Sequence, residues 1–275
     1  MRPKKVLKAR VLTALVLAPL ALMVLFWFPK DRFLLVIDGV LLLGAWEWSR
    51  LAGLKTAVTK GGYIASVAVL LVLLHQFESV LPVTGILVTG LIFWLFALFW
   101  VVRYPAICIW KTTAVRLLIG YAVLLPLWVA LGDLKGQAYS NEWILMLLLL
   151  VWGADIGAYF TGKSLGKTKL APAVSPGKTR EGLYGGLVSC LLVGLVFSLW
   201  FELALDSLVY LMLLSVAVGM ISVLGDLFES MMKRHQGIKD SSQLLPGHGG
   251  ILDRIDSLTA AAPLFAVGVQ FVALA

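Results

Sequence analysis

The chain is poor in the residues that build a soluble surface or a covalent framework. Only 14% of its 275 residues are Asp, Glu, Lys or Arg, and it has two cysteines, Cys108 and Cys190. These fall in an expected loop and an expected helix, so we expect no disulfide bond. The polar segments run to only about 20–30 residues, below the ~50 residues of the smallest domains, which excludes a separate soluble domain.

Hydrophobic residues dominate instead. They make up 60% of the sequence, and the mean hydropathy is +0.95. Because an apolar helix of roughly 20 residues crosses a hydrocarbon core about 30 Å thick, we expect an all-α, polytopic integral membrane protein with about nine transmembrane helices. The expected spans are 10–28, 33–49, 62–76, 83–102, 115–131, 142–161, 183–203, 207–228 and 257–275.

Basic residues predict the orientation of these helices. The chain has 23 Lys and Arg against 15 Asp and Glu, a net charge of +8. With a cytoplasmic N-terminus, every basic residue except Lys30, Arg32 and Lys135 lies on the cytoplasmic side, as the positive-inside rule requires. We therefore expect the C-terminus on the outer side. The positive net charge is explained by the cytoplasmic loops, so we expect no nucleic-acid partner. The basic N-terminal segment and the apolar run after it could be a signal peptide, but no small-residue cleavage site follows before Phe28. We therefore expect that the first helix is retained.

The two parts of the chain differ in where their polar residues lie. We expect residues 1–140 to form a scaffold of transmembrane helices that carries any dimer contacts. Residues 141–275 are expected to form the catalytic region, with cytoplasmic loops 162–182 and 229–257. No internal repeat is visible, which disfavours a transporter built from inverted halves.

Four carboxylates lie inside apolar runs, where ionisable groups are costly and by default indicate function. Asp155 and Asp226 lie toward the expected cytoplasmic ends of their helices. The alternative for each is a helix-end carboxylate that reaches water or pairs with a neighbouring lysine. Glu47 lies between two tryptophans and is interpreted as an interfacial residue. Asp38 lies nearer the middle of the membrane, and the sequence offers no explanation for it.

The most polar stretch runs from 230 to 256, between two apolar runs. Asp253 and Asp256 are three residues apart at the start of the last helix and share one face; the helix macrodipole alone is one reason to find them there. With Asp226 nearby, these oxygen ligands suit Mg²⁺, which takes one or two carboxylates plus substrate phosphates. Glycines let backbone N–H groups approach a phosphate closely. The predicted phosphate-binding glycines are Gly247, Gly249 and Gly250.

The loop SPGKTREG, residues 175–182, is a second polar cluster. Its candidate phosphate ligands are Ser175, Lys178, Thr179 and Arg180, with Glu181 to orient one of them. Two simpler interpretations remain open. The loop is basic because it is cytoplasmic, or it starts a helix that Ser175 or Thr179 caps.

One further pattern is expected to be accidental. Residues 157–164 read GAYFTGKS and match the P-loop pattern, but a P-loop needs a preceding strand and a βαβ domain. Here the pattern starts inside an apolar helix. A CDP-alcohol phosphotransferase is also excluded, because Asp38-Gly39 lacks the rest of the aspartate motif of those enzymes.

The last polar segment reads S-x2-K-R-x4-K-D-x5-P-G-H-G-G-x2-D-R-x-D from Ser230 to Asp256. This pattern resembles the signature of the bacterial phosphatidate cytidylyltransferases, which make CDP-diacylglycerol. The element S-P-x-K-T-x-E-G from Ser175 and the stretch that begins at Asp155 are similar to the same family. The resemblance covers residues 150–257, and the first 140 residues match only as a run of apolar helices.

The resemblance implies transfer of a cytidylyl group from CTP to phosphatidic acid, release of pyrophosphate, and one or two Mg²⁺ ions. It also implies a role in phospholipid biosynthesis, a homodimer and residence in the bacterial inner membrane. We assign the metal to Asp226 and Asp253, supported by Asp256 and Asp155. The predicted catalytic residues are Lys178, Lys233, Arg234, Lys239, Asp240, His248 and Arg254.

We predict a funnel at the cytoplasmic side, lined by Asp155, Asp226 and the segment 247–256. A cavity open to the bilayer and to the cytosol lets each substrate stay in its own phase. One rival is a lipid kinase that uses CTP, which would leave a phosphorylated lipid and CDP. The other is a transporter or channel, which would place ionisable groups near the midplane and on both sides.

Overall fold

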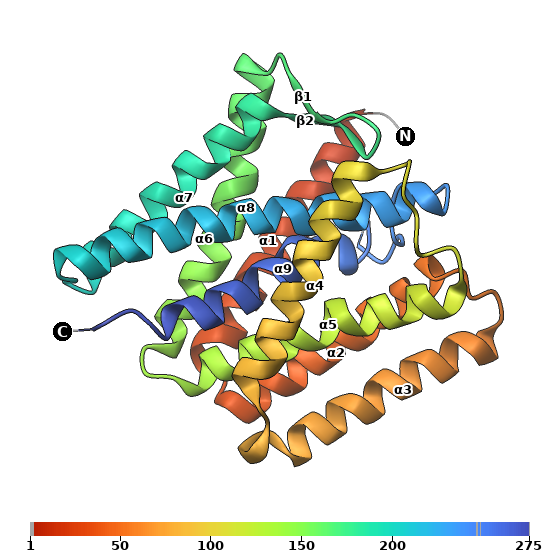
Figure 1. Ribbon diagram of the computed structural model, residues 1–275, viewed down its shortest axis with the longest axis horizontal. Helices are drawn as coiled ribbons and strands as arrows, with labels where there is room; N and C mark the ends of the chain where they lie inside the picture. Colours follow the sequence, from red (N-terminus) through yellow and green to blue (C-terminus); the bar gives the residue numbers. More distant parts are fainter. Residues whose placement is uncertain (1–2, 246, 248, 275) are drawn as a thin grey trace.

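The protein is described by a computed structural model over residues 3–245, 247 and 249–274. This part of the chain forms nine α-helices, a 3-10 helix η1 (Glu78–Val80) and two short strands (Figure 1). The helices are α1 (Pro3–Trp27), α2 (Lys30–Leu51), α3 (Ala57–Gln76), α4 (Val83–Arg103), α5 (Thr113–Gly136), α6 (Ser140–Leu165), α7 (Arg180–Trp200), α8 (Leu205–His235) and α9 (Leu252–Val269). Each expected apolar span corresponds to one of them, with ends shifted by a few residues.

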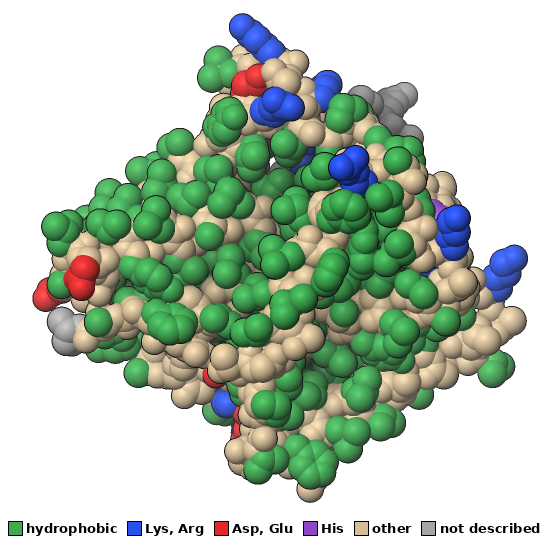
Figure 2. All heavy atoms as spheres, viewed as in Figure 1, with side chains coloured by type: hydrophobic (Ala, Val, Ile, Leu, Met, Phe, Trp, Pro, Cys, Tyr) green, Lys and Arg blue, Asp and Glu red, His purple; other side chains and the backbone are tan. Residues whose placement is uncertain are grey.

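Six of the described helices, α3 to α8, are long and apolar enough to cross a membrane. Of the other three, α2 and α9 hold at least three charged residues in every 18-residue stretch, and the described apolar part of α1, Leu15–Trp27, is shorter than 18 residues. The chain is thus a helical, polytopic membrane protein, while the count of nine spans stays a prediction. On the face shown in Figure 2, hydrophobic side chains cover the middle, and Lys and Arg lie mainly at the top and along the right margin.

The expectation of a purely α-helical chain missed a small hairpin in the loop 162–182. Strands β1 (Lys169–Ala171) and β2 (Ser175–Thr179) pair antiparallel, and in Figure 1 they extend to the right from the upper ends of α6 and α7, which they connect. Backbone groups that pair across a hairpin do not depend on water. Val174, in the turn, is buried and holds the hairpin to the bundle. Thr179 caps α7, since the Gly182 N–H donates to its Oγ1 at 3.1 Å.

Glycines bring α6 and α7 into close contact. A Cβ added at Gly186 would lie 2.7 Å from the carbonyl oxygen of Ala154, and one at Gly157 would lie 2.6 Å from that of Gly185. Both distances are too short for a real side chain, so the helices meet backbone to backbone. The P-loop-like stretch 157–164 lies wholly within α6, which confirms that its match is accidental.

Helix α9 packs against α4, α5 and α8, so both parts of the chain contribute to one core. Three successive alanines of α9, residues 260–262, are fully buried. At the start of α9 the contact with α8 is especially close, because a Cβ at Gly225 would meet the backbone oxygen of Asp256. This approach brings Asp226 of α8 near Asp256 of α9.

Asp38, which the sequence left unexplained, joins three helices. Its Oδ1 accepts a hydrogen bond from the Trp128 indole N–H of α5 at 2.7 Å. Its Oδ2 lies 2.8 Å from Nε2 of His75 on α3. A carboxylate in an apolar region needs such partners, and these contacts give Asp38 a structural role in this bundle.

We predict that Gly186→Val destabilises the protein by about 1–3 kcal/mol, because the added atoms have no room between α6 and α7. Thermal unfolding in detergent would measure the loss. Gly39→Ala is the matched control, since no atom lies within 4 Å of its added Cβ. Equal melting temperatures for the two variants would contradict the close packing described here.

Candidate active site

The two polar clusters of the sequence meet through one ion pair. Lys178, on β2, places its Nζ 2.7 Å from Oδ2 of Asp226, on α8. The Ser230 hydroxyl donates to the other oxygen of Asp226 at 3.1 Å. Both charged side chains are about a quarter exposed, at 25% for Lys178 and 29% for Asp226. The structure therefore unites a predicted phosphate ligand with a predicted metal ligand, and Asp226 has the lysine partner that the alternative interpretation required.

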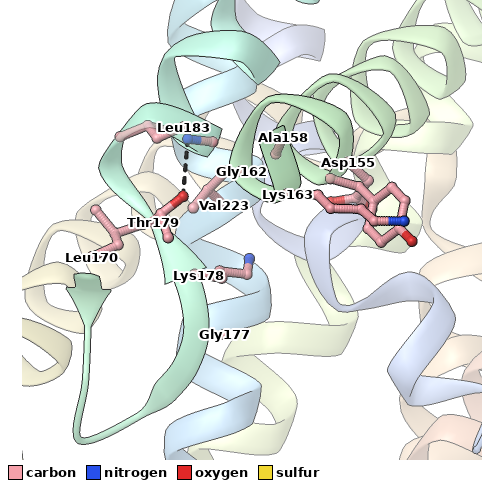
Figure 3. Close-up of a pocket in the computed structure, with 12 residues that line it drawn as sticks. Asp155, Ala158, Gly162, Lys163, Leu170, Gly177, Lys178, Thr179, Leu183 and Val223 are labelled. Carbon is pink, nitrogen blue, oxygen red and sulfur yellow. Dashed lines mark hydrogen bonds between the residues drawn. The ribbon is translucent and has the colours of Figure 1, made fainter. Parts of the chain in front are cut away.

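A cavity of about 340 Å³ lies beside this pair, between α6, α7 and the hairpin. Asp155 lines it from α6, and Lys178 and Thr179 line it from β2, as Figure 3 shows. The charges of Lys178, Asp226 and Arg254 all act on Asp155. The predicted funnel is thus present only in part: Asp155 faces the cavity, but neither Asp226 nor any described residue of the segment 247–256 is among those that line it.

A second ion-pair cluster lies deeper, around Lys233 of α8. Its Nζ lies 2.6 Å from Oδ1 of Asp253 and 3.2 Å from Oε2 of Glu229. All three side chains are at most 10% exposed. Within the described residues, the other oxygen of Glu229 is buried and has no hydrogen-bond partner. Sequence reasoning missed Glu229, although its position one turn before Lys233 on the same helix face was a usable signal.

Asp253 also braces the Gly-rich turn. Its Oδ2 accepts hydrogen bonds from the Ser241 N–H at 3.0 Å, the Ser241 hydroxyl at 2.9 Å and the Gly250 N–H at 2.7 Å. Gly249 has φ +83°, and a Cβ there would lie 2.6 Å from the same carboxylate oxygen. The turn thus needs Gly249 for its backbone conformation and for the approach of Asp253. Its role in phosphate binding stays a prediction.

The interpretation of Glu47 as an interfacial residue is wrong. Its residue exposure is 0%, and its carboxylate accepts hydrogen bonds from the Ser241 and Ser242 hydroxyls and from the backbone of Ile251 and Leu252. The flanking tryptophans obscured this role. One sequence feature indicated the role of Glu47: the start of α9 has no Ser, Thr, Asn or Asp to cap it, so a cap has to come from another part of the chain.

The remaining predicted residues lie around these clusters with varied roles. Arg234 is exposed, and its Nε donates to the carbonyl oxygen of Val174 at 3.2 Å, which braces the hairpin. Glu181 accepts hydrogen bonds from the backbone of Lys167 and Thr168, so it orders the loop before β1. The exposed members of the predicted set are Arg180, Lys239, Asp240, Gly247 and Arg254, and Ser175 is half-buried on β2. His248 lies outside the described residues.

The predicted metal ligands do not form a ready-made metal site. Among the described residues, no group of three His, Cys, Asp or Glu side chains is arranged to hold an ion. Asp226 nevertheless lies near enough to Asp155 and Asp256 for their charges to interact. In this described part of the chain, the carboxylates of the two clusters outnumber the lysines that pair with them. One buried oxygen of Glu229 has no hydrogen-bond partner there. This donor set fits Mg²⁺ held by one or two carboxylates together with substrate phosphates.

An apolar groove of about 690 Å³ adjoins the polar cavity. It runs between α4, the hairpin and α8, and Trp94, Leu98 and Leu224 are among its lining residues. The groove and the cavity share three lining residues, which are Leu170, Leu183 and Val223. The charged cavity and the apolar groove therefore adjoin at these three side chains.

The fold and the site define a polytopic membrane protein with a charged cavity beside an apolar groove. Comparison with known proteins identifies it further: the chain belongs to the cytidylyltransferase family, whose model matches residues 8–272. It is 48% identical to the phosphatidate cytidylyltransferase of Pseudomonas aeruginosa, over 94% of this chain and 96% of that relative. It is 40% identical to that of Haemophilus influenzae, over 97% and 99%. It is 34% identical to that of Bacillus subtilis, over 94% and 95%.

We predict that Lys233→Met lowers the free energy of unfolding by about 3–5 kcal/mol, because it leaves Glu229 and Asp253 buried without their cation. Denaturation in detergent would measure the change. Lys239→Met is the control, since an exposed lysine should alter stability by no more than about 0.5 kcal/mol. A similar effect of both substitutions would show that the Lys233 cluster contributes little to stability.

Proposed function

We propose that this chain transfers a cytidylyl group from CTP to phosphatidic acid, and that CDP-diacylglycerol and pyrophosphate are the products. The observation that carries the proposal is the position of the Lys178–Asp226 pair. It lies beside a polar cavity that shares a wall with an apolar groove. The family membership and the names of the relatives support the same reaction.

The reaction needs charge neutralisation more than acid–base chemistry. A phosphate oxygen of phosphatidic acid forms a bond to the α-phosphorus of CTP. The bond from that phosphorus to the oxygen that bridges the α- and β-phosphates breaks, and this oxygen leaves with the pyrophosphate. The attacking oxygen is already ionised near neutral pH, so no strong general base is required. Rate acceleration then comes from in-line positioning and from stabilisation of the developing negative charge. Lys178, which lines the cavity, supplies a cation for the nucleotide phosphates.

We assign Mg²⁺ to Asp226 and Asp256, with Asp155 close by. These carboxylates would hold Mg²⁺, which would offset the negative charge of the nucleotide phosphates and of the leaving pyrophosphate. Asp253 was predicted as a ligand too, but its carboxylate already accepts hydrogen bonds from Lys233, Ser241 and Gly250. We therefore propose that Asp253 holds the Gly-rich turn, and that Asp226 holds Lys178 at the cavity, where its ammonium group can meet the nucleotide phosphates.

Phosphatidic acid is proposed to approach through the apolar groove. Its acyl chains would pack against α4 and α8, where the groove is lined by side chains such as Leu98 and Leu224. Its phosphate would pass the shared residues Leu170 and Val223 to reach Lys178. CTP would enter the polar cavity from the aqueous side, so neither substrate has to leave its own phase.

We further propose that the site faces the cytoplasm of a bacterial inner membrane, with the N-terminus inside and the C-terminus outside. The distribution of Lys and Arg supports this orientation. The homodimer stays a prediction, which the molar mass of the detergent-solubilised protein would test.

The function is tested with CTP labelled at the α- or the γ-phosphate, added to inverted membrane vesicles without detergent. We expect α-label to enter the lipid and γ-label to leave as pyrophosphate, because the site is exposed on the cytoplasmic face. Right-side-out vesicles should remain inactive until they are permeabilised. Entry of γ-label into the lipid would indicate a kinase instead. No lipid label in permeabilised vesicles would favour the transporter.

We predict that Asp226→Asn lowers kcat by about 10²–10³-fold, because the substitution removes a charge that organises the cation and Lys178. The measurement is steady-state cytidylyl transfer over a Mg²⁺ titration, with chelation abolishing wild-type activity. Asp133→Asn is the matched control: this carboxylate on α5 contacts Gln137 and Gln270 and none of the site residues in the described part of the chain. Comparable losses in both variants would remove Asp226 from the site.

A further inference from the structure

Helix α9 carries much of the site, yet its first turn has no cap of its own. The residue at its N-cap position is Ile251, whose side chain makes no capping hydrogen bond. The free N–H groups of a first helical turn need acceptors when they are buried. Here Glu47 of α2 accepts them, from the Ile251 N–H at 2.9 Å and the Leu252 N–H at 2.6 Å. The cap comes from a residue about 200 positions earlier in the chain.

Glu47 binds the loop before α9 with the same carboxylate. Its Oε1 also accepts the Ser242 hydroxyl at 2.5 Å, and its Oε2 accepts the Ser241 hydroxyl at 3.1 Å. Each carboxylate oxygen of Glu47 thus accepts hydrogen bonds from one serine hydroxyl and one backbone N–H. Three donors, the Ser241 hydroxyl that it shares with Asp253, and the positive end of the α9 dipole stabilise a carboxylate that has no exposed surface.

The loop is shaped to receive this carboxylate. A Cβ at Gly250 would collide with both oxygens of Glu47 and with the Ser241 hydroxyl, so the backbone comes close only because residue 250 is glycine. Ser241 then extends the connection, since its hydroxyl also lies 2.9 Å from Oδ2 of Asp253. Asp253 in turn holds Lys233 at 2.6 Å.

We propose that Glu47 is a positioning residue for the reaction, which sets the segment 241–253 against α8 through Ser241, Asp253 and Lys233. The proposal rests on the location of the reaction at α8 and α9 given above. It makes α2 part of the catalytic unit, where the division at residue 140 assigned it to the scaffold. Glu47 touches no reacting atom, and it acts by fixing the start of α9, which carries Asp256.

Glu47→Gln tests this proposal with the smallest change of shape. The amide keeps one acceptor oxygen but turns an NH₂ group toward a serine hydroxyl and a backbone N–H. The hydroxyl can accept from the NH₂ group, whereas the backbone N–H loses its acceptor. We expect kcat to fall by about 100-fold, the effect of a misplacement of about 1 Å. KM for CTP should change by no more than about threefold, because the cavity at Lys178 is not disturbed. Amide hydrogen exchange should rise at Ile251 and Leu252.

Asp38→Asn is the matched control. It replaces another hydrogen-bonded carboxylate on the same helix, where the partners are Trp128 and His75 and not the loop. We expect kcat within about twofold of wild type per folded molecule, and unchanged exchange at Ile251 and Leu252. If Glu47→Gln does not fold, Ser242→Ala removes a single donor and should lower kcat by about tenfold.

Two results would overturn the proposal. The first is a folded Glu47→Gln or Ser242→Ala protein whose kcat stays within about threefold of wild type. The second is a loss of kcat in Asp38→Asn equal to that in Glu47→Gln, which would make Glu47 structural only. These results differ from failure of the proposed function, in which the wild-type protein itself would transfer no cytidylyl group to phosphatidic acid.

Discussion

The pairing of charges inside a helix bundle is the constraint on which the rest of the structure depends. A buried ion that loses its partner is strongly destabilising, so a carboxylate or lysine in the membrane-embedded part needs either an opposite charge or hydrogen-bonding groups around it. Lys233 meets Glu229 and Asp253, and Lys178 meets Asp226. These contacts fix the hairpin and the start of α9 onto α8. The same charges that stabilise the bundle are then available to a phosphate-bearing substrate.

The polar cavity and the apolar groove explain how one site can take one substrate from water and another from the lipid bilayer. The polar cavity beside Lys178 and the apolar groove along α4 share a wall of only three side chains. An enzyme that joins a nucleotide to a lipid needs both surfaces within the length of one phosphate group. Close contacts at Gly186 and Gly225 hold α6, α7, α8 and α9 near enough to form them. Packing by small residues is therefore a condition for the chemistry.

Hydrophobic periodicity predicted the helices, and the spacing of polar residues indicated the polar segments from which the candidate site residues come, because both are local properties of the sequence. Thr179 as a helix cap and the residues 150–257 as the polar region followed in the same way. Partnerships between distant residues were not predictable. Glu47 looked interfacial beside its tryptophans, and its true partners lie about 200 residues away. The β1–β2 hairpin is too short to show a strand pattern, and Asp253 braces a turn where a metal ligand was expected.

The most direct measurement is an experimental structure of the full chain with CTP and Mg²⁺ in a lipid nanodisc. We expect the triphosphate in the cavity between α6, α7 and the hairpin, with Lys178 against a phosphate and Asp226 facing the metal ion. Nucleotide bound elsewhere, with no phosphate at Lys178, would contradict the assignment of this site to cytidylyl transfer.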